Sequence, residues 1–280
     1  MSRPGMSQTP LKHRLIRMAD EMPAHPRNVH RLLQATSTLA TPPKMVARII
    51  SQDPVMTLLV LKAANLIHFG HSGRIASIDA AMALVGYNTV KNVALKAVQQ
   101  GILPSNGDQS PDPSALLTHF QATGWYARQI GLRLNPQCLD PSEFYVAGLL
   151  HDVGKWLLCF ALPGDYAQVW RLSLQEKRPL KEVEQRELGI DHEEIGTLLG
   201  EKWLLPVALT ECLGSHHGAK EWTGRNVLRD AVLVGNQIAV LAKAGQGGCP
   251  VQEPLPARLK KQLGGKPAEL LATLEPLPEL

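Results

Sequence analysis

The stretch PSEFYVAGLLHDVGKWLLCF, residues 141–160, decides how the fold of this chain is interpreted. Its apolar residues follow the period of a helix rather than the strict alternation of a strand. Asp140 supplies an N-cap side chain, Pro141 suits the first turn, and Glu143 is placed to complete a capping box. We therefore predict a single helix over 141–160.

Helical periodicity continues through almost every other segment, and runs of β-branched residues are rare. Asp53 and Pro54 open one helix with an N-cap acceptor and a first-turn proline, and Ser77 caps another. The sequence therefore predicts an all-α fold. The other predicted helices span 55–66, 78–84, 89–99, 114–134, 162–176, 180–188, 192–203, 206–213, 227–244, 256–263 and 268–274.

Turn-forming residues divide the chain into parts. Residues 104–113, PSNGDQSPDP, form the predicted linker loop between a helical part at 22–103 and a second helical part at 114–244. A basic segment, 1–21, precedes them. Residues 245–280 contain GQGGCP and PLPEL, so we expect a looser tail whose short helices lie on the surface.

Composition places the chain among globular proteins, with 44% hydrophobic and 19% charged residues. The apolar run from Val55 to Ile67 is too short to span a bilayer, and the first ten residues lack a signal-peptide core. The four cysteines form no CxxC pair. These features predict a cytoplasmic protein that does not associate with a membrane.

Positive charge is concentrated near the N-terminus, where residues 1–48 hold eight basic and two acidic side chains. Such a segment could bind nucleic acid or another anionic partner. It could equally be the solvated face of amphipathic helices. We favour the second interpretation, because the segment lacks the aromatic side chains that stack on bases.

Several histidines accompany the pair His151-Asp152 within HDVGK. Imidazole nitrogens and a carboxylate suit iron, manganese, nickel or zinc, and Asp152 could bridge two such ions. The other candidate metal ligands lie in or beside the neighbouring predicted helices and are His119, His192, His216 and His217. The alternative is that the pair is a hydrogen-bonded core feature and that each of the other histidines lies on the surface or caps a helix.

Two ions held in this way would clamp a phosphate, and a metal-bound water would attack it. Lys155 follows His151 by four residues, so the predicted helix places both on one face. Its charge could offset that of a transferring phosphoryl group, which makes Asp152 and Lys155 the candidate catalytic residues. Lys155 could also be a solvated helix residue, and of the two interpretations we favour this one.

The segments MPAHP (22–26), IISQDPVMTLLVLKAANLIHFG (49–70) and IASIDAAMALVGYNTVKNVAL (75–95) resemble the successive signatures of the bacterial HDOD module. The histidines and Asp152 follow in the order typical of HD phosphohydrolases. This resemblance covers about residues 20–243. It implies an HD/PDEase-like helical bundle with an N-terminal helical HDOD subdomain.

Two departures from the HD enzymes bear on the function that the resemblance implies. Asn236 in LVGNQIA stands where those enzymes have a final aspartate ligand, which argues against full activity. GAKEWTG follows the paired histidines, so the GYP signature of cyclic dinucleotide phosphodiesterases is absent. The loss would weaken an ion held by His119, His151 and Asp152, while a second site at Asp152, His192, His216 and His217 could remain. The resemblance therefore implies one or two divalent ions per chain.

The resemblance implies a signal-transduction protein that acts as a binding or scaffolding module. No receiver or similar signalling domain is recognisable, so we expect its input from a separate signalling protein. The alternative is a metal-dependent phosphohydrolase that acts on a nucleotide or other phosphate ester. Nucleic-acid binding through the basic N-terminus is the third hypothesis.

Overall fold

The structure of this chain is a computed structural model that describes residues 8–37, 41–67, 75–97, 111–138, 140–217, 225–248 and 254–278. These residues contain helices and no strand, which confirms the predicted all-α class. Most of the predicted linker, residues 104–110, lies outside the described residues.

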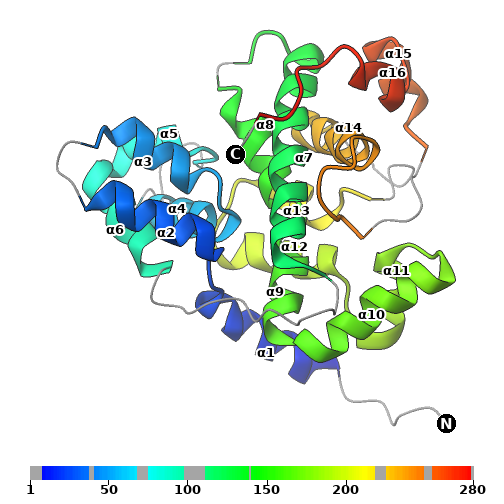
Figure 1. The fold of residues 1–280 in the computed structure, drawn as a ribbon, viewed down its shortest axis with the longest axis horizontal. Coiled ribbons are helices and arrows are strands. Elements are labelled where there is room, and N and C mark those ends of the chain that lie inside the picture. The colour runs from blue at the N-terminus through cyan, green and yellow to red at the C-terminus, as the bar shows by residue number, and fades with distance from the viewer. Residues whose placement is uncertain are drawn as a thin grey trace.

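Helices α2 to α6 form one group, and α7 runs through the middle of the remaining helices (Figure 1). The helices are α1 (Gln8–Met18), η1 (Ala19–Glu21), α2 (Pro26–Thr36), α3 (Pro43–Ile50), α4 (Pro54–Ile67), α5 (Ile78–Val85), α6 (Tyr87–Lys96), α7 (Pro113–Leu134), α8 (Ser142–Leu150), α9 (Val153–Ala161), α10 (Pro163–Glu176), α11 (Leu180–Leu188), α12 (His192–Lys202), α13 (Val207–Gly214), α14 (Val227–Leu241), α15 (Ala257–Leu263) and α16 (Pro267–Leu271).

Buried polar side chains fix the N-terminal group of helices. Asp53 caps α4, as predicted, by accepting from the backbone N–H groups of Val55 and Met56 at 3.0 Å. Its second oxygen accepts from the backbone N–H of His25 at 2.9 Å, which ties the segment before α2 to the start of α4. Asn65 exchanges two hydrogen bonds with the backbone of Ile75, so it links α4 to the segment before α5.

The two helical parts share one hydrophobic core. The side chain of Gln121 on α7 donates to the carbonyl of Gln52 at 2.8 Å. The indole of Trp156 on α9 is buried and donates to the carbonyl of Pro23 at 3.0 Å. The two helical parts therefore meet at an interface that is both apolar and hydrogen-bonded.

Helices α7 and α8 approach closely because both carry glycine at the crossing. A Cβ atom on Gly148 would lie 2.7 Å from the Cα of Gly124, and a Cβ on Gly124 would lie 2.7 Å from the carbonyl oxygen of Tyr145. Helix α14 packs against α7 on the same terms, since a Cβ on Gly235 would lie 2.6 Å from the backbone nitrogen of Ala127. This packing brings His119 on α7 next to the end of α8.

The prediction of one helix over 141–160 is wrong in one respect. Helix α8 ends at Leu150, His151 and Asp152 form a turn, and α9 starts at Val153. The backbone N–H of Lys155 donates to the carbonyl of Asp152 at 2.9 Å, an i to i+3 bond in place of the α-helical pattern. Because of this turn, the side chain of Asp152 points in a different direction than it would in a continuous helix.

The segment Ser142–Ala161 is long and apolar enough to cross a membrane by length and composition alone. However, 83% of its most apolar window is buried inside the protein, where it forms α8 and α9. It is the central segment of the helical body.

Helices near each end of the described chain pack against this body. Helix α1 of the basic segment lies against α9 and α12, in the second helical part (Figure 1). The expectation of a tail that lies loosely on the surface is wrong, because Leu259 and Leu270 are buried. Helices α15 and α16 pack against α7 and α14 and close the second part of the fold.

Candidate metal centre

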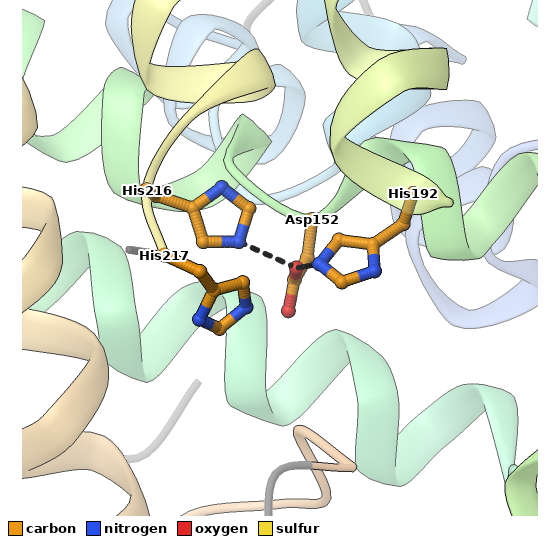
Figure 2. Close-up of side chains that lie close together, drawn as sticks. All are labelled: Asp152, His192, His216 and His217. Carbon is orange, nitrogen blue, oxygen red and sulfur yellow. Dashed lines mark ion pairs between the residues drawn. The ribbon is translucent and has the colours of Figure 1, made fainter. Parts of the chain in front are cut away.

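Separate helices, and the turns beside them, bring the predicted ligands to one place. His119 lies in the first half of α7, His151 and Asp152 form the turn between α8 and α9, and His192 is the first residue of α12. His216 follows the end of α13, with His217 directly after it. Figure 2 shows the imidazoles of His192, His216 and His217 around the carboxylate of Asp152.

The Asp152 carboxylate lies at the centre of this arrangement. Its Oδ2 atom lies 3.1 Å from Nε2 of His151 and 3.7 Å from Nε2 of His119. Its Oδ1 atom lies 3.2 Å from Nε2 of His216 and 3.5 Å from Nε2 of His192. Ligand atoms fall into two groups, each within 4.8 Å, that share Asp152: one with His192, His216 and His217, the other with His119 and His151. We call these the Oδ1 side and the Oδ2 side.

Hydrogen bonds orient three of the imidazoles. Nδ1 of His151 lies 2.7 Å from the carbonyl of Gly148, and Nδ1 of His216 lies 3.0 Å from that of Cys212. Nδ1 of His192 lies 2.5 Å from the carboxylate of Glu184. Each acceptor places the ring proton on Nδ1 and leaves the Nε2 lone pair directed at Asp152, which is the arrangement that prepares histidine to bind a metal.

The imidazole Nε2 atoms and one carboxylate oxygen at the centre of the cluster are buried without a hydrogen-bond partner in the described chain. Within the described residues, Nε2 of His151, His192 and His216 and Oδ1 of Asp152 make no hydrogen bond. In the neutral tautomers, lone pairs on nitrogen therefore face lone pairs on the carboxylate at 3.1 to 3.5 Å. Buried acceptors that face one another need a cation between them, so this donor set fits a transition-metal ion.

The interpretation of Lys155 as a solvated helix residue is wrong. Its side chain is buried, and its Nζ atom donates to Oδ2 of Asp152 at 2.6 Å and to the carbonyl of Gly247 at 2.8 Å. Gly247 has no room for a side chain, because a Cβ would lie 2.6 Å from the ring of His119. The segment 245–248, expected to be part of a loose tail, thus forms one wall of the cluster.

Two acidic residues near the cluster were not predicted from the sequence. Glu184 on α11 is buried and bonds both the ring and the backbone N–H of His192. Glu193 accepts from the backbone N–H of His217 at 2.7 Å and pairs with Lys181. The sequence placed only Glu193 next to a candidate ligand, His192. An acidic residue in the first turn of a helix stabilises that helix, so its position there did not indicate a role in the cluster.

Asn236 is buried in α14, the helix that packs on α7, and its side-chain oxygen has no hydrogen-bond partner among the described residues. Its predicted place beside the ligands stays a prediction.

Of the basic N-terminal side chains, Lys12 pairs with Glu194 on α12, while Arg14 and Arg17 are exposed. The pairing of Lys12 agrees with a structural use of part of this charge.

Burial changes the protonation of the cluster. It lowers the pKa of His119 to about 3, and it also lowers the pKa of His151 and, further, that of His217. Burial opposes charge on His192 too, but the adjacent Glu184 carboxylate raises its pKa. Burial alone would raise the pKa of Asp152, yet His151 and Lys155 hold it well below its usual range. At neutral pH, His119, His151 and His217 are neutral and available as ligands.

We expect the metal-free chain to lose stability as the pH falls from about 7.5 to about 5. His119, His151 and His217 resist protonation in the folded state, whereas their unfolded counterparts bind a proton below about pH 6.5. The unfolded state then binds more protons, and His119 alone lowers the free energy of unfolding by about 2 kcal/mol at pH 5. His192 acts in the opposite direction because its pKa is raised.

Urea unfolding of chelator-treated protein at several pH values measures this dependence. The substitution His119→Gln should flatten the dependence, whereas His30→Gln, at an exposed position, should leave it unchanged. Stability that rose as the pH fell from about 7 to about 5 would contradict the neutral state of these rings in the folded protein.

The fold and the cluster define a class: an all-helical protein with an HD-type arrangement of histidines around one aspartate. The family model of the HDOD domain matches residues 22–219, and the chain belongs to this family. The chain also resembles a response regulator, MmoQ from Methylococcus capsulatus, with 25% identity and a TM-score of 0.69 over 90% of this chain and 98% of that one.

Two further proteins are similar to this chain. An HDOD domain protein of unknown function from Geobacter sulfurreducens shares the fold at 24% identity and a TM-score of 0.51, over 94% of this chain and 93% of that one. An uncharacterized protein of Treponema pallidum (strain Nichols) is 25% identical over 203 residues. That match covers 71% of this chain but 39% of the relative, so it spans less than half of that protein.

Proposed function

We propose that the chain is a metal-binding regulatory module of signal transduction, which acts in the cytoplasm by binding a signalling protein rather than by turnover. One observation carries the metal-binding part: lone pairs of oriented imidazoles face a buried carboxylate with no donor between them. The ions that suit this donor set are iron, manganese, nickel and zinc, one or two per chain.

Two features support the regulatory part. The similarity to MmoQ, a response regulator, extends over nearly the whole of both chains. In addition, the four imidazoles that face Asp152 are at most 1% exposed, which suits a centre that stabilises or senses better than one that admits a substrate. A partner would bind to the surface, and the ion would set the stability of the body beneath it.

The alternative is a metal-dependent phosphohydrolase that acts on a nucleotide or another phosphate ester. The observation that favours it is the sharing of Asp152 between two ligand groups, since a bridging carboxylate is what a two-ion phosphate site requires. Lys155 would then have to leave Asp152 or Gly247 to reach a phosphate.

Elemental analysis of the chain purified without chelators tests the proposal. We expect one or two transition-metal ions per chain. The metal content should fall by roughly 10-fold or more in the double variant His192→Ala/His216→Ala. The variant His30→Ala, at an exposed site, is the matched control. A native chain without metal contradicts the proposal, and release of phosphate from p-nitrophenyl phosphate or a nucleotide by the metal-loaded chain would favour the alternative.

A further inference from the structure

The two oxygens of Asp152 lie in opposite electrostatic surroundings. Oδ2 accepts a hydrogen bond from the Lys155 ammonium at 2.6 Å, whereas Oδ1 has no donor among the described residues. Both oxygens are buried, so water does not screen this difference. One side of the carboxylate already has a cation, and the other has none.

The groups behind the ligands increase this asymmetry. On the Oδ1 side, the Glu184 carboxylate contacts Nδ1 of His192, and Glu193 lies 3.7 Å from Nδ1 of His216. On the Oδ2 side, Nδ1 of His151 meets only a backbone carbonyl, and Nδ1 of His119 has no hydrogen-bond partner within the described chain. Negative charge behind imidazole strengthens it as a ligand, so the Oδ1 side attracts a dication more strongly.

Lys155 is also held in place from behind. Its Nζ atom donates to the carbonyl of Gly247, and the backbone of Gln246 donates to the carbonyl of Ala115 on α7 at 3.0 Å. A Cβ on Gly248 would lie 2.5 Å from the ring of Trp170, so the 245–248 segment is packed on both sides. The ammonium therefore has two fixed acceptors, and a dication bound to Oδ2 would have to lie against it.

We infer that the Lys155 ammonium takes the place of a second metal ion, so that the chain binds one ion on the Oδ1 side of Asp152 and none on the Oδ2 side. Lys155 is then a positioning residue that sets the number of ions. A dication and an ammonium that both contact Oδ2 in a buried site repel each other strongly. Oδ2 also cannot offer the same lone pair to the ion and to the ammonium. This inference rests on the proposed metal-binding function and deepens it.

The test is the number of ions per chain after saturation with manganese or zinc and removal of free metal. We expect about one ion for the native chain and about two for Lys155→Met, which keeps an unbranched side chain as far as Cε but removes the ammonium group. Lys96→Met, at an exposed position on α6, should keep about one ion. Adding His119→Ala to Lys155→Met should return the content to about one, because the second ion would need that ligand.

A second arm uses the native lysine, in case Lys155→Met does not fold. His119→Ala alone should keep the one ion, whereas His216→Ala should lose it. Two ions in the native chain, one ion in folded Lys155→Met, or loss of the ion in folded His119→Ala would each overturn the inference while leaving the proposed function intact. A native chain that binds no ion overturns both.

Discussion

The substitution Asp152→Asn is expected to abolish metal binding and to lower the free energy of unfolding of the metal-free chain by about 3 to 5 kcal/mol. The amide is nearly the same size as the carboxylate, so the effect is electrostatic. The neutral amide would deprive the buried Lys155 ammonium of the negative charge that lies 2.6 Å away, and only uncharged acceptors such as the carbonyl of Gly247 would remain among its hydrogen-bond partners in the described chain. Removing one partner of a buried ion pair costs far more than the pair contributes.

Metal is lost for a separate reason. Asp152 is the only residue common to both ligand groups, so its replacement removes an anionic ligand from the Oδ1 side and the Oδ2 side together. Chemical unfolding of metal-free protein and elemental analysis of metal-loaded protein measure the two effects independently. Asp165→Asn, at an exposed position in the first turn of α10, is the matched control. It should keep its metal and lose at most about 1 kcal/mol, the usual contribution of an acidic residue at a helix N-terminus.

The double variant Asp152→Asn/Lys155→Met separates the ion pair from simple loss of packing. Because it removes both charges, it should recover part of the stability that Asp152→Asn loses. A single variant as stable as the native chain, or one that retained its ion, would show that Asp152 is neither the partner of a buried charge nor a ligand.

The fold class and the ligand set could be predicted because both depend on local sequence. Helical periodicity, the cap at Asp53 and the cap at Ser77 each follow from neighbouring residues, and the structure confirms all three. The histidines could be predicted as a set because HDVGK is typical of HD proteins, and the other histidines follow the order of their metal ligands. Their convergence on one carboxylate depends on how α7, α12 and α13 pack, and no spacing in the sequence contains that information.

The unpredicted parts of the centre depend on tertiary contacts. Lys155 follows His151 by four residues, and a continuous helix would place it beside that histidine. The chain instead turns at His151 and Asp152, and the side chain of Lys155 forms an ion pair with Asp152, three residues before it. Glu184 bonds a residue eight positions later, and Gly247 bonds one 92 positions earlier. Sequence patterns report periodicity within one helix, and these contacts join different elements.

Gly154 is the position at which the smallest change should do the greatest harm to the backbone of the centre. A Cβ there would lie 2.1 Å from the carbonyl oxygen of His192, with the carbonyl carbon and Cα of the same residue at 2.9 and 3.0 Å. These are backbone atoms at the start of α12, so they cannot rotate away as a side chain would. Helix α9 and helix α12 would have to separate.

We expect Gly154→Ala to lower the free energy of unfolding by about 3 kcal/mol, at the upper end of the usual cost of overpacking. Resistance comes from the anchoring of His192, whose backbone N–H and ring both bond the buried Glu184. Helix α12 is held from its other side as well, because a Cβ on Gly196 would lie 2.3 Å from the carbonyl oxygen of Leu213. The cost is therefore not relieved by a small shift of α12.

The same displacement should weaken metal binding, because His192 would move away from Oδ1 of Asp152, now 3.5 Å from its Nε2 atom. Thermal unfolding and a metal titration measure the two consequences. Gly164→Ala is the matched control: it lies in α10 with no atom within 4 Å of the added Cβ, so alanine should be neutral or stabilise by about 0.5 to 1 kcal/mol. Equal stability of the two alanine variants would mean that α9 and α12 are not in the close contact that holds His192 in the centre.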